Sequence, residues 1–245
     1  MTHTRLLLLA ALTPALALAA CKKSEPAPDV TGPSNAAVVA TNSAAPGAGW
    51  VDTVVATSDG GFRMGNPNAP AKLIEYGSRT CPHCGDFAKE SLPDIKQMVA
   101  AGKLSYEFRD FPIHAPDLAA ILLGQCNGAE SFFPILEGMF ADQPNTLPKL
   151  EKLPPTLQAA MQGKSVNEQA VMWADYLGYT DFVGQRGVPE AKAKACLADP
   201  KAVDLLSKRL QALGQSIQYT PSFIINGGDV VSGLTWPQIK SQLGG

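Results

Sequence analysis

The sequence predicts an α/β protein in which a strand–helix–strand unit precedes a long helical segment, a hairpin and a last helix. Three observations support this order. Apolar residues follow strand spacing near residues 73–76 and 104–108, and helical spacing over about 114–213. Asn226-Gly227-Gly228 separates two short runs, as in a hairpin. With 245 residues, 45% of them hydrophobic and 17% charged, the chain can bury a full core.

The charge balance argues against one class of partner. Twenty Lys and Arg against 22 Asp and Glu leave a formal net charge of -2. Proteins that bind nucleic acid usually carry a basic surplus on the binding surface. We therefore expect no nucleic acid partner.

Residues 1–20 have the pattern of an export signal. Arg5 precedes an apolar run from Leu6 to Leu18, which is shorter than the ~20 residues that span a bilayer as a helix. The Leu-Ala-Ala-Cys ending resembles the lipobox of bacterial lipoproteins, and this resemblance implies cleavage before Cys21 and lipidation of that residue. The alternative is an ordinary secretory signal with a chance cysteine. Either way the mature chain lies outside the cytoplasm, where disulfides persist.

The segment 21–49 reads as a lipidated flexible linker. Residues 22–49 contain no Leu, Ile, Met or aromatic residue, so they cannot bury enough apolar surface to order. The segment is also too short and polar to form a dimerisation module, so we expect a monomer. The folded domain is then 50–245.

The strand–helix–strand unit surrounds the first pair of cysteines after the linker. A buried strand is expected over Leu73–Tyr76, and a second over 104–108, where apolar and polar residues alternate. A helix is expected between them, because apolar residues recur at helical spacing at Phe87, Leu92, Ile95 and Val99. Pro93 should kink this helix and Gly102 should end it.

A helical insertion is expected over about 114–213. Ser165 with Glu168 forms a capping-box pattern, and Asp199 before Pro200 suits the start of a helix that Gly214 ends. The aromatic residues Phe132, Phe133 and Phe140 lie at helical spacing and are assigned to the core rather than to a substrate groove.

The C-terminal part is expected to form a hairpin and a helix. Ser222–Ile225 and Asp229–Ser232 flank the glycine-rich turn. Thr235 with Gln238 then caps the last helix.

Cys81-Pro82-His83-Cys84 is the main chemical motif. It follows a predicted strand and begins a predicted helix, so the Cys81 sulfur would face unpaired amides and the positive end of the helix dipole, which favour the thiolate. Cys81 is the candidate nucleophile. His83 could add charge or a hydrogen bond, and Cys84, one turn later, could resolve a mixed disulfide.

Three other kinds of site share features with this motif. A zinc site would need a second close pair of ligands, which Cys126, Cys196 and His114 do not provide. Covalent haem attachment is excluded because Gly85, not histidine, follows the second cysteine. A purely structural disulfide stays possible, although a two-residue gap at a helix start is prone to exchange.

From about Gly65 to the C-terminus the chain resembles DsbA-type thiol:disulfide oxidoreductases, which have a thioredoxin-like fold. The resemblance rests on the Cys-Pro-His-Cys motif, on Glu-Tyr-Gly-Ser-Arg-Thr before it, and on Thr220-Pro221-Ser222-Phe223-Ile224. It implies a thioredoxin-like fold with a helical insertion between the βαβ half and the C-terminal hairpin–helix half.

The resemblance also implies roles for three residues outside the motif. Pro221 would be a cis-proline opposite the dithiol, and the backbone of Thr220 would pair with substrate. Threonine replaces the valine of the best-known oxidant, which leaves the redox direction open. Glu75, six residues before Cys81, would be a buried acid that relays a proton to Cys84. The alternatives are an ordinary trans proline and an exposed glutamate on an edge strand.

Cys126 and Cys196 are expected to pair with each other, as the second bridge of some DsbA-like proteins does. Closing a loop of about 70 residues would stabilise the fold by roughly 4 kcal/mol in the chain-entropy model. Free buried thiols are the alternative.

The resemblance implies an oxidase that gives the Cys81–Cys84 disulfide to newly exported or unfolded proteins. It would be anchored by lipid to the bacterial cell envelope, would face the periplasm, and would be regenerated by a quinone-linked membrane thiol oxidase. No metal or organic cofactor is expected. The alternatives are a reductase or isomerase of the same fold and, from a different class, a dithiol metal chaperone.

Overall fold

A computed structural model describes residues 49–244 of the chain. The predicted export signal, the lipidation at Cys21 and nearly all of the linker lie outside these residues. Within the described part, no helix is both long enough and apolar enough to cross a membrane.

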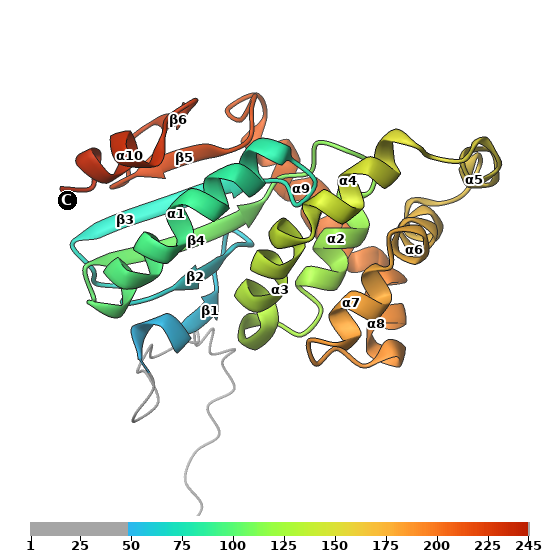
Figure 1. The fold of residues 1–245 in the computed structure, drawn as a ribbon, viewed down its shortest axis with the longest axis horizontal. Coiled ribbons are helices and arrows are strands. Elements are labelled where there is room, and N and C mark those ends of the chain that lie inside the picture. The colour runs from blue at the N-terminus through green and yellow to red at the C-terminus, as the bar shows by residue number, and fades with distance from the viewer. Residues whose placement is uncertain (1–48, 245) are drawn as a thin grey trace, which may run out of the picture. The chain divides into compact units, whose positions relative to one another are not determined.

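One six-stranded sheet forms the centre of the described domain (Figure 1), with the strand order β1-β2-β4-β3-β5-β6. β3 and β4 are parallel, because α1 connects them by a crossover, and the other neighbours are antiparallel. The strands are β1 (Val54–Ala56), β2 (Phe62–Met64), β3 (Ala71–Gly77), β4 (Leu104–Asp110), β5 (Ser222–Ile225) and β6 (Val230–Ser232).

Four of these strands, β3 to β6, are predicted from the sequence, whereas the N-terminal hairpin of β1 and β2 is not. β1 and β2 have three residues each, which is too short for a two-residue period to stand out. A 3₁₀ turn, Trp50–Asp52, precedes them.

α1 (Pro82–Ala100) is the helix predicted after Cys81. Pro82 is at its first position, where a missing amide costs nothing, and Gly102 follows its end with a positive φ of 69°. The helix continues through Pro93, the residue expected to kink it. Its apolar side packs on the sheet, where the rings of Phe87 and Phe223 have centroids 4.7 Å apart.

The predicted insertion is confirmed as a series of eight helices that run from Asp117 to Leu213, several of which gather beside one end of the sheet (Figure 1). The capping box of Ser165 and the N-cap of Asp199 form as predicted. The helices are α2 (Asp117–Gly124), α3 (Ala129–Ala141), α4 (Gln143–Glu151), α5 (Pro155–Met161), α6 (Val166–Leu177), α7 (Tyr179–Gly184), α8 (Glu190–Leu197) and α9 (Pro200–Leu213). The last helix, α10 (Trp236–Gln242), starts at the predicted cap Thr235.

The buried apolar residues form two clusters. One lies between the sheet, α1, α3 and α10, and the other lies within the insertion. Phe132, Phe133 and Phe140 belong to the first cluster, so their assignment to the core is confirmed. Cys126 and Cys196 form a disulfide that ties the end of α2 to α8 within the insertion.

Candidate active site

The two cysteines of the motif lie at the start of α1, directly beyond the end of β3. Cys81 is the N-cap residue and Cys84 lies in the first turn. Both are free thiols and both are buried, with 3% and 0% of their surface exposed. The pair is therefore reduced in this structure and is largely enclosed by the protein.

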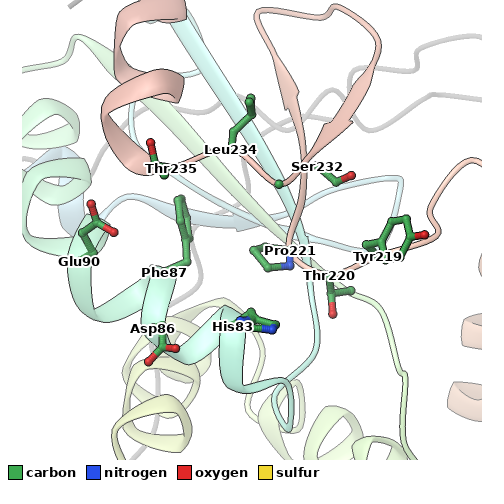
Figure 2. Close-up of a pocket in the computed structure, with 11 residues that line it drawn as sticks. His83, Asp86, Phe87, Glu90, Tyr219, Thr220, Pro221, Ser232, Leu234 and Thr235 are labelled. Atoms are coloured by element: carbon green, nitrogen blue, oxygen red, sulfur yellow. The ribbon is translucent and has the colours of Figure 1, made fainter.

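The segment before β5 closes over the Cys81 sulfur. The peptide bond between Thr220 and Pro221 is cis, and the Cys81 thiol donates a hydrogen bond to the Thr220 carbonyl at 3.4 Å. β5 brings this segment here because it is antiparallel to β3, with Phe223 opposite Glu75. Figure 2 shows Pro221 and Thr220 facing His83 at the start of α1.

The surroundings of the two sulfurs separate their acidities. A hydrogen bond from the Cys84 thiol, followed by contributions from Thr220 and from the Cys84 and His83 amides, lowers the pKa of Cys81 to about 5, although burial opposes the shift. The pKa of Cys84 is raised instead, chiefly by burial and then by Cys81 and Glu75. Cys81 is therefore the thiolate and Cys84 the thiol at neutral pH.

This origin of the low pKa differs in part from the sequence expectation. The backbone amides at the helix start contribute as expected, but the largest effect comes from the Cys84 thiol. His83 contributes its amide, whereas its side chain is exposed and lines the neighbouring groove.

Thr220→Val is expected to raise the pKa of Cys81 by about one unit, the size of one hydrogen bond to a charged group. The Thr220 hydroxyl is buried and has no hydrogen-bond partner among residues 49–244, so it is free to turn toward the thiolate. Valine keeps the branched shape and removes the hydroxyl. The ultraviolet absorbance of the thiolate measures the pKa as pH is varied. Thr220→Ser, which keeps the hydroxyl, should stay close to the parent value, and equal values for all three chains would contradict this role.

Glu75 is buried in the centre of the sheet, not exposed on an edge strand. It is 1% exposed and lies between Phe108 of β4 and Phe223 of β5, on the sheet face that α1 covers. Burial raises the pKa of its carboxyl to about 8, a hydrogen bond from Tyr106 acts in the opposite direction, and the charge of Cys81 raises it further. Glu75 is therefore mostly protonated at neutral pH.

A buried ion pair that is not predicted from the sequence supports the residues just before Cys81. Arg79 Nε is 2.7 Å from Asp110 Oδ1, with 0% and 2% of the two side chains exposed. Gln125 donates a further hydrogen bond to Asp110 at 2.9 Å. The guanidinium passes α2 at Gly124, where any side chain would collide with it. This pair joins the active-site loop to the end of β4 and to the insertion.

Asp117 and Gln143, both from the insertion, hold the backbone of the same loop. The buried Asp117 carboxylate accepts hydrogen bonds from four residues on two loops: Ser78, Thr80, Ile113 and His114. Gln143 Nε2 donates to the carbonyls of Arg79, at 3.1 Å, and Cys81, at 2.9 Å. The sequence shows no local signal for the contacts with the active-site loop, because Asp117 and Gln143 lie 37 to 64 residues from their partners there.

A groove of about 610 Å³ adjoins the dithiol. Figure 2 shows it between α1 and the segments that flank β5 and β6. Its walls are formed by His83 and Phe87 of α1, by Pro221 and by Leu234, and Asp86 and Glu90 add negative charge on the α1 side. The arrangement can hold an extended polypeptide beside Cys81.

The remaining predicted sites lie elsewhere. The Cys126–Cys196 disulfide belongs to the insertion, and Cys21 lies outside the described residues. Among residues 49–244, no three His, Cys, Asp or Glu side chains are grouped so that they could hold a metal ion.

Comparisons with known proteins bear on the fold and the family. Residues 57–244 match the sequence pattern of the family described as Thioredoxin. A Rickettsia bellii protein that carries the name of a protein-disulfide oxidoreductase is 26% identical over 167 residues, which are 67% of this chain and 56% of that one. A Rickettsia conorii protein of similar name is 25% identical over 172 residues, 69% and 54% of the two chains. This chain thus matches just over half the length of these relatives.

Solved structures give the same fold. A protein-disulfide isomerase from Novosphingobium aromaticivorans has a TM-score of 0.70 and 27% identity, over 77% of this chain and 100% of that one. Wolbachia pipientis alpha-DsbA1 has a TM-score of 0.57 and 22% identity, over 74% and 90%. The fold expected from the sequence, thioredoxin-like with a helical insertion, is confirmed.

Proposed function

Because the chain belongs to the thioredoxin family, we propose that it is a thiol:disulfide oxidoreductase whose redox centre is the Cys81–Cys84 pair. One observation carries the proposal. The pKa values of the two thiols are shifted in opposite directions, so that Cys81, at the N-cap of α1, is a thiolate at neutral pH while the buried Cys84 stays protonated. Thiolate character determines which sulfur exchanges.

The finer proposal is that the chain acts as an oxidase. A low pKa at Cys81 stabilises the reduced form, which makes the corresponding disulfide a stronger oxidant. A substrate thiolate attacks Cys81 of the disulfide, the Cys81–Cys84 bond breaks, and the electron pair goes to the Cys84 sulfur, which takes up a proton. A second substrate thiolate then attacks the substrate sulfur of the mixed disulfide. This step forms the substrate's disulfide and releases Cys81 as thiolate.

The groove beside Pro221 supports a polypeptide substrate. Its volume and apolar lining suit an extended segment, and the backbone of Thr220 faces the sulfur that would carry the mixed disulfide. We propose unfolded or newly exported proteins as substrates, and a quinone-linked membrane thiol oxidase as the partner that restores the disulfide.

The proposed location is the bacterial cell envelope, where a lipid on Cys21 would hold the domain facing the periplasm. This follows from the export-signal pattern and the Leu-Ala-Ala-Cys sequence. Cys21→Ala should move the protein from the membrane fraction to the soluble fraction of the cell envelope. An unchanged membrane fraction would contradict lipidation at this residue.

The direction of exchange is tested by equilibrium with glutathione. An oxidase should have a readily reduced disulfide and should oxidise a reduced, unfolded protein in stoichiometric amounts. An isomerase, which the name of the Novosphingobium structure favours, or a reductase should keep its dithiol reduced in the same buffers. A potential as negative as that of a structural disulfide, with no oxidation of substrate, would contradict the oxidase proposal.

The stability difference between the reduced and oxidised chains should depend on pH. The pKa of Cys81 is lowered from 9.0 to about 5 in the folded reduced chain. A pKa that is lower in the folded chain than in the unfolded chain adds stability. This added stability is complete above the pKa of the unfolded chain and is lost as pH falls through the pKa of the folded chain. The reduced chain should therefore gain stability relative to the oxidised chain from about pH 5 to about pH 9. Urea unfolding of both forms measures this, and a constant difference over the range would contradict it.

A further inference from the structure

The hydroxyl of Tyr106 is the only hydrogen-bond partner that the Glu75 carboxyl has in the part of the chain that the structure describes. Tyr106 lies on β4 opposite Leu73 of β3, two residue pairs before Glu75 and therefore on the same face of the sheet. Its hydroxyl donates to Glu75 Oε2 at 2.7 Å, and both residues are 1% exposed. Water therefore does not compete for this bond.

The second carboxyl oxygen is left free. Glu75 Oε1 is buried and has no hydrogen-bond partner among residues 49–244. A buried polar atom without a partner is costly, and such atoms are often retained for function. One oxygen is thus held by Tyr106, while the other is available to carry a proton.

The redox step supplies a reason for this arrangement. When a substrate thiolate attacks Cys81, the electron pair of the broken Cys81–Cys84 bond goes to a sulfur with no exposed surface. A buried thiolate there is disfavoured, so a proton must reach it from within the protein. Glu75 is buried on the sheet face under α1, and Cys84 is buried in the first turn of that helix. The Glu75 charge accordingly contributes to the raised pKa of Cys84.

We propose that Tyr106 is a positioning residue of the redox centre, which holds Glu75 through one oxygen and stabilises the carboxylate that remains after Glu75 has given its proton to Cys84. The inference rests on the proposed function. In this step the O–H bond of Glu75 breaks, an S–H bond forms at Cys84, and the negative charge moves from sulfur to the carboxylate. Reoxidation reverses the transfer.

A phenol is suited to this role. It stabilises a carboxylate by a hydrogen bond without adding a buried charge of its own, so the carboxyl stays protonated at neutral pH and still ionises when required. The pKa of Tyr106 is itself raised well above its ordinary value, by burial and by Glu75, so it remains a donor at every pH of interest.

Tyr106→Phe tests the proposal because it removes the hydroxyl and keeps the ring, which packs 5.8 Å from the ring of Phe133. The measurement is the titration of the Glu75 carboxyl carbon by NMR in the reduced chain. We expect a midpoint near 8 in the parent chain and one about a unit higher in the variant, a roughly tenfold change in proton affinity. Tyr179→Phe, at another buried tyrosine, should leave the Glu75 midpoint unchanged.

Rates provide the second readout, which a merely structural role would not affect in the same way. Reduction of the Cys81–Cys84 disulfide at neutral pH should slow several-fold in Tyr106→Phe. In a Glu75→Gln background the same replacement should have no further effect. An unshifted Glu75 midpoint, or equal slowing with and without Glu75, would overturn the positioning role.

A failure of the Tyr106 role can be distinguished from a failure of the proposed oxidoreductase function. If Tyr106→Phe does not fold, the carbon that bears the Tyr106 hydroxyl can be followed in the unaltered chain. Its resonance should move with the Glu75 midpoint, and a resonance that is constant through this titration would overturn the inference. A parent chain that shows the coupled titration but never exchanges disulfides would contradict the proposed function and, with it, the proton transfer.

Discussion

Cys81→Ser is expected to reduce disulfide exchange by a factor on the order of a thousand or more, down to the rate of the buffer alone. Removal of a nucleophile leaves only binding contributions to catalysis. Serine keeps the size of the side chain but provides neither a thiolate nor a disulfide. The assay is the oxidation of a reduced, unfolded protein by the oxidised chain in a glutathione buffer.

Cys84→Ala is the matched variant, because it keeps the nucleophile and removes the resolving thiol. It should accumulate mixed disulfides through Cys81, which denaturing gels without reductant would show. It should also raise the pKa of Cys81, since the Cys84 thiol makes the largest contribution to lowering it. Retained exchange in Cys81→Ser, or trapping through another cysteine, would contradict the assignment of Cys81.

Asp110→Asn is expected to destabilise the domain by about 3–5 kcal/mol, the cost of removing one partner from a buried ion pair. The Arg79 guanidinium would remain in a site with 0% exposure of its side chain and without its carboxylate. The Phe132 ring, 5.0 Å from the guanidinium carbon, cannot replace a full negative charge. Urea unfolding of the oxidised parent and variant measures the change, provided that the dependence of the unfolding free energy on urea concentration is the same in both.

An exposed ion pair is the control for this effect. Lys194 and Glu190 are paired on the surface of α8, where water screens the two charges, and Glu190→Gln should leave the stability nearly unchanged. Replacing both members of the buried pair, in Arg79→Met with Asp110→Leu, should recover much of the loss because no charge is left unpaired. A loss below about 1 kcal/mol in Asp110→Asn would show that the pair does not support the loop.

The sequence predicted the elements whose signals are local. Capping residues at Ser165, Asp199 and Thr235 mark helix starts, and all three act as predicted. The Cys-Pro-His-Cys motif could likewise be placed from the sequence, because the strand before it and the helix that it begins are both predicted from neighbouring residues. The missed elements, β1 and β2, are short and gain their stability from pairing with each other and with β4 rather than from a pattern of their own.

The interactions around the active site depend on strand order and on distant contacts. The neighbours of Glu75 in the sequence could not show whether it was buried, because its burial follows from the central place of β3 between β4 and β5. The roles of Arg79 and Gln143 could not be predicted from the sequence either. Arg79 pairs with Asp110, at the end of another strand, and Gln143 reaches the Cys81 carbonyl from the insertion. Only the fold brings these pairs together.

Titration of the Cys81 thiol in the reduced chain is the most direct test of the proposed redox centre. The thiolate absorbance, read against pH with Cys81→Ser as the blank, should rise with a midpoint of about 5. Cys84 should contribute no second transition near neutral pH, because its pKa is raised. A midpoint of about 8.5, the value of a free cysteine, would show that the structure does not activate this sulfur and would contradict the proposed function.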